Sequence, residues 1–486
     1  MIKFHHVSYR YGAHADFQLK EVDLHVTEGE FVLLTGVSGC GKTTLTRCIN
    51  GIIPHFHEGE LQGEIIVGGR TVQNSEIYQI GQLAGSVFQD PRSQFFTTNV
   101  MDELAFGCEN YGVPRHEIYS RLEEAVTDLR LEDITHSSVF KLSSGQRQRL
   151  AIASAYMTKP IIYVMDEPSA NLDAESTEQL RHILMKLKKE GCTIIIAEHR
   201  LYYLQDLVDR VVYMVNGRIE RQYLRPQWLE LQEEQLMRMG LRKTQNMQME
   251  LRGIQKTALE ELASGGFNAP QETGDDGTKL EARNLSFRYK NASPVLQEVS
   301  FEARAGDIIG VVGTNGAGKT TLAKLMCGLL KPSNGQILLN GKPLSERDRR
   351  RASYFVMQDC DFQLFASSVE DELRLGNGEA PDLDERVELA LDSMHLKNER
   401  ERHPASLSGG QKQRVSIAVS LVKQSDILWF DEPTSGLDGF HMRGMSKVLR
   451  QLAASGKIVL VISHDAEFLA LTCTRLLHLD QGKIVP

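Results

Sequence analysis

The sequence lacks any long hydrophobic run. Its longest apolar stretches, such as Ile161–Met165 and Ile194–Ala197, are far shorter than the roughly 20 residues that a membrane helix needs. The opening residues MIKFHHVSYR also lack the long apolar region of a secretory signal peptide. We therefore expect a soluble, cytosolic chain, and any role at a membrane would depend on a partner.

Paired cysteines and an excess of basic residues are also missing. The seven cysteines are scattered without a CxxC pair, which argues against a zinc or disulfide framework. Lys and Arg number 55 against 64 Asp and Glu, a net charge of −9, so a dedicated binder of nucleic acid or anionic lipid is not indicated. With 486 residues, 41% of them hydrophobic and 24% charged, the chain is globular and long enough for two to four domains.

The chain contains one internal repeat. Three segments recur in the same order: Phe31–Thr44 as Ile308–Thr321, Leu142–Arg149 as Leu407–Arg414, and Met165–Asp173 as Phe430–Asp438. The interval from Ser143 to Glu167 equals that from Ser408 to Glu432, and the intervals from these glutamates to His199 and His464 are also equal. Matched spacing over separate motifs predicts two copies of one domain.

The repeat sets the predicted domain boundaries. Each copy closes with a hairpin-like run, and Asn216-Gly217 is a strong turn signal in the first. We expect a first domain at 1–221, a linker at 222–278 and a second domain at 279–486. The linker has mixed charge and is predicted to be helical near Gln227–Leu262, with a loose Gly/Pro/Asp stretch at Ser264–Thr278. An RNA-binding arm would need a clear basic excess, so a solvated tether is favoured.

Each half carries a glycine-rich phosphate-binding loop. Gly36–Thr43 and Gly313–Thr320 fit the pattern G-x4-GK[ST], and each follows an apolar run and precedes a helical one. Glycines let successive backbone N–H groups and a helix N-terminus face phosphate. The lysine then reaches the β- and γ-phosphates, and the threonine hydroxyl coordinates Mg²⁺. Two complete copies predict two ATP sites.

Paired carboxylates follow a predicted buried strand in each half. Asp166-Glu167 comes after Ile161–Met165, and Asp431-Glu432 comes after Ile427–Phe430. A carboxylate at the carboxyl end of a strand beside a phosphate loop can hold the Mg²⁺ shell. The glutamate that follows can orient or deprotonate an attacking water.

Together these motifs resemble the ATP-binding-cassette (ABC) ATPases, in both halves of the chain. The signature LSGGQ is intact at Leu407–Gln411 and has one change, Ser144, at Leu142–Gln146. The resemblance implies an α/β fold with two P-loop NTPase (RecA-like) nucleotide-binding domains, each with a helical subdomain bearing the signature. It also implies intramolecular head-to-tail pairing, in which each ATP lies between one half's phosphate loop and the other half's signature.

The resemblance assigns roles by position. Glu167 and Glu432 would be the catalytic carboxylates, His199 and His464 the switch histidines, and Asp173 and Asp438 part of the D-loops. Gln89 and Gln358 would be the Q-loop glutamines that link the catalytic site to a transport partner. The Mg²⁺ ligands would be Thr43, Asp166, Gln89, Thr320, Asp431 and Gln358. The ATP-binding residues would be Tyr11, Gly36, Ser38, Gly39, Cys40, Gly41, Lys42, Thr43, Thr44, Ser143, Gly145, Gln146, Tyr289, Gly313, Asn315, Gly316, Ala317, Gly318, Lys319, Thr320, Thr321, Ser408, Gly410 and Gln411. Tyr11 and Tyr289 would stack on adenine, although such residues can also be strand aromatics packed on the core.

The segments after the Q-loop glutamines narrow the resemblance. Phe88–Phe96 and Met357–Phe365 look like those of energy-coupling factor (ECF) transporter ATPases. This likeness implies an ATPase that drives import of a vitamin or a transition-metal ion. The partners would be a membrane scaffold subunit and a small substrate-capture membrane subunit, with no nucleic acid, and the protein would be peripheral on the cytoplasmic face of the membrane. An ordinary ABC importer with a generic Q-loop remains open.

Two alternatives belong to other classes. A soluble tandem ABC ATPase acting on ribosomes usually has an Asn-His-Leu-Asp stretch after Asp-Glu-Pro, whereas this chain has Asn171-Leu172-Asp173. The tandem ATPase of a sugar importer often has one degraded half, and here both glutamates are present.

Ser144 replaces a signature glycine, so we predict that the site of Lys319 and Ser143 is the slower one. His5-His6 and His55-Phe56-His57 lack regularly spaced partner ligands, and we expect no metal there.

Overall fold

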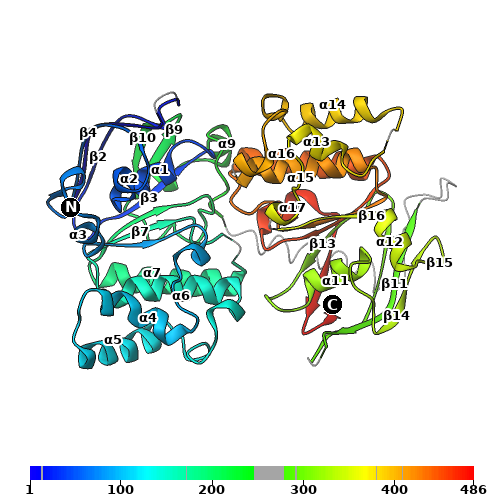
Figure 1. Ribbon diagram of the computed structural model, residues 1–486, viewed down its shortest axis with the longest axis horizontal. Helices are drawn as coiled ribbons and strands as arrows, with labels where there is room; N and C mark the ends of the chain where they lie inside the picture. The colour runs from blue at the N-terminus through cyan, green and yellow to red at the C-terminus, as the bar shows by residue number, and fades with distance from the viewer. Residues whose placement is uncertain are drawn as a thin grey trace. The chain divides into compact units, whose positions relative to one another are not determined.

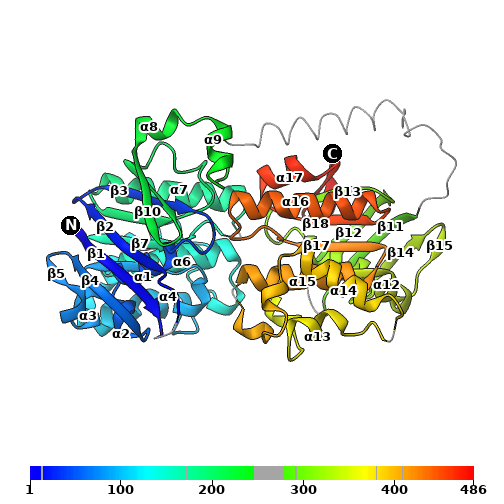
Figure 2. The same cartoon turned by 90° about the horizontal axis from the view of Figure 1, so that it is seen from above.

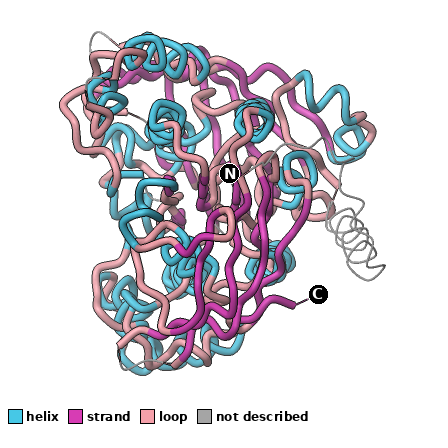
Figure 3. Tube along the Cα trace, turned by 90° about the vertical axis from the view of Figure 1, so that its right-hand side faces the viewer, coloured by secondary structure: helices cyan, strands magenta, loops and turns pink. Residues whose placement is uncertain are grey.

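The computed structural model shows two compact units, formed mainly by the residues before and after the predicted linker (Figure 1). It describes residues 1–12, 15–170, 172–245, 278–290, 293–358, 360–378, 380–407 and 409–485. Each unit is mixed α/β, with helices flanking the strands (Figure 3). The predicted fold class of two RecA-like nucleotide-binding domains is confirmed.

The first unit is built on a mainly parallel six-stranded sheet with the order β10-β9-β3-β8-β7-β6. Only the β9–β10 pair is antiparallel. A four-stranded antiparallel sheet, β2-β1-β4-β5, accompanies it (Figure 2). The strands are β1 (Ile2–Tyr11), β2 (Leu19–Val26), β3 (Phe31–Gly36), β4 (Gly59–Val67), β5 (Arg70–Thr71), β6 (Ala84–Val87), β7 (Ile162–Asp166), β8 (Thr193–Ala197), β9 (Arg210–Val215) and β10 (Arg218–Leu224).

The helices of the first unit cover both faces of the large sheet. They are α1 (Lys42–Ile49), α2 (Ile52–His55), α3 (Ile77–Gly81), α4 (Val100–Asn110), α5 (Arg115–Asp128), α6 (Ser144–Met157), α7 (Ala174–Lys189), α8 (Arg225–Leu229) and α9 (Glu233–Arg238). Helices α4, α5 and α6 lie together (Figure 1) and form the helical subdomain that carries the signature.

The second unit repeats this topology. Its large sheet has the order β16-β17-β18-β13-β19-β20 and its small sheet the order β12-β11-β14-β15. Its strands are β11 (Lys279–Arg288), β12 (Pro294–Arg304), β13 (Ile308–Val312), β14 (Asn334–Leu339), β15 (Lys342–Pro343), β16 (Ser353–Val356), β17 (Ile427–Asp431), β18 (Ile458–Ile462), β19 (Arg475–Asp480) and β20 (Lys483–Val485). Its helices are α11 (Lys319–Met326), α12 (Glu346–Ala352), α13 (Val369–Arg374), α14 (Leu383–Ser393), α15 (Gly409–Lys423), α16 (Gly439–Ala454) and α17 (Ala466–Thr472).

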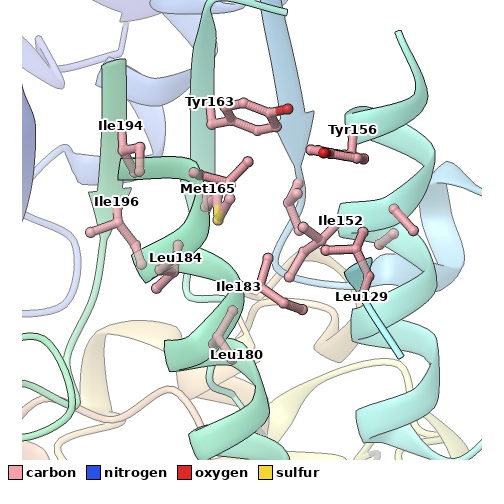
Figure 4. Close-up of a cluster of buried hydrophobic side chains, with 14 of the residues drawn as sticks. Leu129, Ile152, Tyr156, Tyr163, Met165, Leu180, Ile183, Leu184, Ile194 and Ile196 are labelled. Carbon is pink, nitrogen blue, oxygen red and sulfur yellow. The ribbon is translucent and has the colours of Figure 1, made fainter. Parts of the chain in front are cut away.

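Alternation along the buried strands divides the first core in two. Tyr163 and Met165 of β7 face helices α6 and α7 (Figure 4), whereas Ile162 and Val164 belong to the cluster with the small sheet and α1. Strand residues alternate between faces, so an unbroken apolar run fits a sheet covered on both sides.

The predicted closing hairpin is confirmed. β9 pairs with β10 through Asn216 and Gly217, whose φ angles are 48° and 83°. Positive φ at both central residues is the geometry of a type I′ turn, which suits the twist of the strands. The same device, Gln481-Gly482, joins β19 to β20.

The first unit extends past residue 221, where we expected it to end. Trp228, Leu236 and Leu241 are each about 2% exposed and join its main core, and Tyr213 Oη donates to Met239 O at 2.9 Å. Residues 225–245 are therefore packed against the first unit and not part of a solvated tether, because their apolar side chains have a core to join. The rest of the predicted linker helix lies outside the described residues. Within the described part of the chain, no helix is long and apolar enough to cross a membrane.

Candidate functional site

The candidate catalytic residues of the first unit share one edge of the large sheet. β3 ends at Gly36, where the phosphate loop begins, and β7 ends at Asp166. His199 lies just after β8, and Gln89 lies just after β6. Because these four strands are neighbours in one sheet, their carboxyl ends meet, which is where open α/β sheets bind ligands.

The first phosphate loop has the backbone that anion binding needs. Gly39 and Gly41 have φ angles of 78° and 105°, and Gly41 begins α1 without a side-chain cap. Uncapped N–H groups at a helix start attract phosphate. Lys42 is buried and its Nζ donates to Gly36 O at 3.1 Å and Val37 O at 3.3 Å. These are bonds to the loop's own carbonyls, which a phosphate oxygen can replace.

The second phosphate loop matches the first. Gly316 and Gly318 have φ angles of 84° and 103°. Lys319 Nζ donates to Gly313 O at 2.7 Å and Thr314 O at 2.9 Å. Both loops are therefore built in the same way.

Cys40 in the first loop is buried, and its Sγ lies 3.8 Å from Lys42 Nζ. Burial raises its pKa in spite of the nearby ammonium. A thiol is less reactive than a thiolate, so this cysteine fills space in the loop.

An acidic side chain meets the loop threonine in each unit. Thr320 Oγ1 donates to Asp431 Oδ2 at 2.8 Å. In the first unit burial raises the pKa of Asp166, and a hydrogen bond from Thr43 opposes that effect. Asp166 Oδ1 is buried with no hydrogen-bond partner among the described residues. A hydroxyl and a carboxylate with a spare oxygen fit the predicted Mg²⁺, which prefers oxygen ligands.

Glu167 is a buried acid that lies against two other predicted catalytic residues. Gln89 Nε2 donates to its Oε2 at 3.0 Å, and His199 Nε2 lies 3.5 Å from its Oε1. Burial, followed by the charge of the adjacent Asp166, raises the pKa of Glu167 to about 8. The structure therefore brings the predicted glutamate, glutamine and histidine together.

Glu432 occupies the same position in the second unit but has other neighbours. Ser463 Oγ donates to its Oε2 at 3.3 Å, and His464 Nε2 lies 3.7 Å from its Oε1. The His464 ring also lies 3.2 Å from Asn315 Oδ1 in the phosphate loop. Gln358 makes no hydrogen bond to Glu432 among those of the described residues, so only the histidine approaches the glutamate as in the first unit.

Both glutamates have a strained backbone. Glu167 has a φ of 46° and Glu432 a φ of 50°. Their N–H groups donate to the strand next to them, to Ala197 O at 2.8 Å and Ile462 O at 2.9 Å. Left-handed φ costs a non-glycine residue roughly 1–2 kcal/mol, and in both units the bond to the neighbouring strand holds the glutamate in this conformation.

Each predicted adenine-stacking tyrosine lies against the phosphate-loop helix. Tyr11 Oη is 3.4 Å from Thr44 Oγ1 and also accepts from Arg47 at 3.2 Å. Tyr289 Oη is 3.3 Å from Thr321 Oγ1, and the residue as a whole is 43% exposed. Stacking on adenine stays a prediction, and the placement beside Thr44 and Thr321 is what that role requires.

The first signature forms the start of α6. Ser143 Oγ accepts from Gln146 N at 3.3 Å, and Gln146 Oε1 accepts from Ser143 N at 3.0 Å, which is a capping box. A Cβ at Gly145 would lie 2.3 Å from Ser176 Oγ, so packing against α7 requires glycine there. The Gln146 and Gln411 amides also donate to carboxylates of their own subdomains, Asp133 and Glu399.

Ser408 lies outside the described residues, and its predicted contact with ATP stays a prediction. Its neighbour Gly409 stands where the first signature has Ser144. The Gly409 backbone is not left-handed, and a Cβ on it would meet nothing within 4 Å. The backbone at this position therefore does not require glycine. The prediction that the site of Lys319 and Ser143 is slower then depends only on how closely the nucleotide approaches Ser144.

A family model described as "ABC transporter" matches residues 19–170 and 296–435, which include both phosphate loops and both carboxylate pairs. The chain belongs to this family. The family model matches once in each unit. We therefore call each unit a cassette, and the chain contains two of them, as the repeat predicted.

Relatives share the tandem organisation over the full chain. A Treponema denticola protein named "Putative ABC transporter ATP-binding protein" is 43% identical over 485 residues, covering 100% of this chain and 96% of that relative. A Methanosarcina mazei protein of the same name is 34% identical over 520 residues, covering 100% and 88%.

Solved structures of similar fold cover 99% of the chain. One titled "Model of ribosome-bound archaeal Pelota and ABCE1" has a TM-score of 0.68 at 24% identity and is covered to 78%. Another, "RNase-L Inhibitor", has a TM-score of 0.62 at 22% identity and is covered to 90%. At these identities the likeness establishes the fold, not the function.

One buried carboxylate of the first cassette, Glu198, belongs to none of the sequence motifs. Glu198 is 2% exposed and lies between Ala197, the last residue of β8, and His199. The available signal was an acidic residue directly after the apolar run Ile194–Ala197. Buried charges occur where several donors meet them.

Proposed function

We propose that the chain is the ATP-hydrolysing subunit of an ABC importer of the ECF type, for a vitamin or a transition-metal ion. Each cassette would bind Mg²⁺ and ATP at the carboxyl edge of its large sheet. The two cassettes would pair head to tail, and their closing and opening would drive membrane subunits. The names of relatives that match over the full chain support a transporter.

The observation that carries this proposal is an exposed phenylalanine at the same place in each cassette. Phe96 is 74% exposed and Phe365 is 75% exposed. A buried carboxylate holds each loop: Glu103 Oε2 accepts from Phe96 N at 3.0 Å, and Glu372 Oε2 accepts from Phe365 N at 2.7 Å. Large exposed aromatic rings on a fixed loop are typical of a surface that receives an apolar partner.

The same loop is tied to the catalytic site. Gln94 Oε1 accepts from Phe88 N at 3.0 Å, which fixes the backbone beside Gln89. Gln89 in turn donates to Glu167. A partner that displaces Phe96 would therefore shift the hydrogen-bonded segment from Phe88 to Phe96, and with it Gln89 and its bond to the catalytic glutamate. A transport ATPase requires coupling of this kind.

Removing both phenylalanines tests the proposal. Phe96→Ala with Phe365→Ala should abolish co-purification of membrane subunits and substrate uptake, while ATP hydrolysis by the isolated chain persists. Tyr119→Ala, on the exposed side of α5 (54% exposed), is the matched control and should leave both intact. The proposal is contradicted if substrate uptake survives the double substitution. It is also contradicted if the wild-type chain, purified from detergent extracts, brings no membrane protein with it.

A second candidate is an ATPase that acts on ribosomes. It is suggested by the solved structures of similar fold, whose titles name ribosome-bound and ribosome-recycling proteins. The net charge of −9 disfavours an RNA partner. Sedimentation of the tagged chain through sucrose separates the two candidates, because a ribosomal ATPase should move with ribosomal subunits when ATP hydrolysis is blocked.

A further inference from the structure

Four donors converge on the buried Glu198 carboxylate. Oε1 accepts from Ser169 N at 3.1 Å and from Tyr203 Oη at 2.9 Å. Oε2 accepts from His199 N at 2.6 Å and from Arg200 N at 3.1 Å. All five residues are less than 9% exposed. A carboxylate with this many donors is held in one orientation, because charge-assisted hydrogen bonds are short and strong.

These bonds join three parts of the ATP site. The Glu198 backbone is bonded to the strand that enters the phosphate loop, with its N–H donating to Leu34 O at 3.0 Å and its carbonyl accepting from Thr35 Oγ1 at 3.1 Å. The side chain reaches the backbone of the switch histidine and that of Ser169, the first residue of the segment from Ser169 to Asp173 that we call the D-loop. Glu198 therefore connects the phosphate loop, the D-loop and His199.

Arg200 strengthens the same connection. It is 8% exposed, and its guanidinium donates to Ser169 O at 3.3 Å and to Leu172 O at 3.1 Å. Both carbonyls belong to the D-loop. The segment 198–200 thus bonds to the D-loop backbone through both a carboxylate and a guanidinium.

The second cassette links its D-loop and its switch histidine with other side chains. Ser463, Asp465, Phe468 and Thr434 stand where the first has Glu198, Arg200, Tyr203 and Ser169. Thr434 Oγ1 donates to Asp465 Oδ2 at 2.9 Å, and Asp465 N donates to Ser463 Oγ at 3.1 Å. A second set of contacts can therefore link the D-loop and histidine without a buried glutamate.

A purely structural role is a poor explanation for Glu198. Burial and the adjacent Asp166 raise the pKa of Glu167 most, and Glu198 adds a smaller effect in the same direction, because like charges close together are unfavourable. The second cassette shows that a serine fits at this position. A residue that only filled the core would not need a charge beside the catalytic acid.

We propose that Glu198 is a positioning residue of the first ATP site, which holds His199 and the D-loop residues Ser169 and Leu172 as one rigid body. The inference rests on the proposed ATPase activity. Glu198 acts by fixing positions, because the switch histidine approaches the γ-phosphate only when the D-loop is in place. Positioning of this kind affects turnover more than ground-state binding.

The test uses the full chain with Glu432→Gln, so that turnover reports the first site. Adding Glu198→Gln keeps the size of the side chain but puts an amide where two N–H donors point. We expect kcat to fall about 10-fold while KM and the amount of ATP bound per chain change less than about 2-fold. Tyr203→Phe, which removes one of four donors, should lower kcat about 3-fold. Tyr202→Phe, which removes a neighbouring hydroxyl that is not one of the four donors, is the matched control.

Exchange of the whole set supplies the rescue. Ser169→Thr, Glu198→Ser, Arg200→Asp and Tyr203→Phe together install the contacts of the second cassette, and should restore kcat to within about 3-fold, whereas Glu198→Ser alone should not. Unchanged kcat in both Glu198→Gln and Tyr203→Phe overturns the inference, as does a fall in kcat that only parallels lost ATP binding. If Glu198→Gln does not fold, Tyr203→Phe decides. A parent chain without ATP hydrolysis would instead refute the proposed function.

Discussion

The two cassettes carry the same motifs but surround their catalytic glutamates with different groups. Glu167 accepts from Gln89 and lies near a second buried carboxylate, whereas Glu432 accepts from the Ser463 hydroxyl. The phosphate loops and the strained glutamate backbones are alike. The predicted phosphate-binding residues are therefore the same in both cassettes, whereas the side chains that contact the catalytic glutamate differ.

A second difference lies in the helical subdomains. Glu370 of α13 pairs with Arg374 and Arg400, but the matching residue of α4 is Met101, which packs against the first core. One cassette thus uses an ion-pair network where the other uses apolar contact. The exposed phenylalanine loops, in contrast, are held in the same way in both, with a buried glutamate accepting from the phenylalanine N–H.

The largest expected effect separates the two catalytic acids. Glu167→Gln should lower ATP turnover of the full chain more than Glu432→Gln does, with a loss on the order of 100-fold or more at the altered site. The reason is that the Lys319 site is predicted to be slower, so the Lys42 site carries most turnover. Steady-state hydrolysis by the two single variants provides the measurement. Equal losses, or a larger loss from Glu432→Gln, would mean that Ser144 does not matter.

The loop carboxylates should behave alike in the two cassettes. Glu103 and Glu372 each accept two backbone N–H groups. Glu103→Gln and Glu372→Gln should each cost about 2 kcal/mol, because a buried donor loses its partner. Hydrogen exchange of the Phe96, Thr97, Phe365 and Ala366 amides checks this. Faster exchange in only one cassette would show that the two loops are not equivalent.

The glutamines should separate the cassettes less strongly. Only Gln89 is bonded to its glutamate among the described residues. Gln89→Ala should slow hydrolysis about 10-fold at the first site, and Gln358→Ala should have a smaller effect at the second. Each variant is assayed with the other site silenced at its glutamate. A larger effect of Gln358→Ala would show that ATP binding rearranges the second Q-loop.

The smallest effect concerns stability against acid. Hydrogen bonds from Arg400 are the main cause that lowers the pKa of Glu370 to about 2. A carboxylate with a lowered pKa stabilises the fold above its ordinary pKa of about 4.5, and this contribution is lost as pH falls toward 2. Glu370→Gln should therefore cost about 1 kcal/mol at pH 7 and less at pH 3.

Thermal unfolding of the Glu370→Gln variant at both pH values provides the measurement. The control is Glu401→Gln, whose carboxylate lies 3.9 Å from Arg400 Nε and is 86% exposed. It should change stability very little, because exposed ion pairs contribute little. A difference that is the same at pH 7 and pH 3 would remove the ion-pair explanation.

The sequence alone determined the two-cassette architecture, the phosphate loops and the carboxylate pairs. These features are local, because the glycines, the lysine and the strand before them lie together in the chain and each has a fixed backbone requirement. The closing hairpin was also readable, since Asn-Gly specifies its turn.

Only the tertiary structure decided the rest. That Trp228 and Leu241 join the first core depends on a surface formed by distant strands, so the expected end at residue 221 was wrong. The bond from Gln89 to Glu167 and the four donors around Glu198 come from separate strands and loops. Sequence spacing fixes the order of such groups, but the distances between them are set by how the strands align in the sheet and how the loops pack behind it.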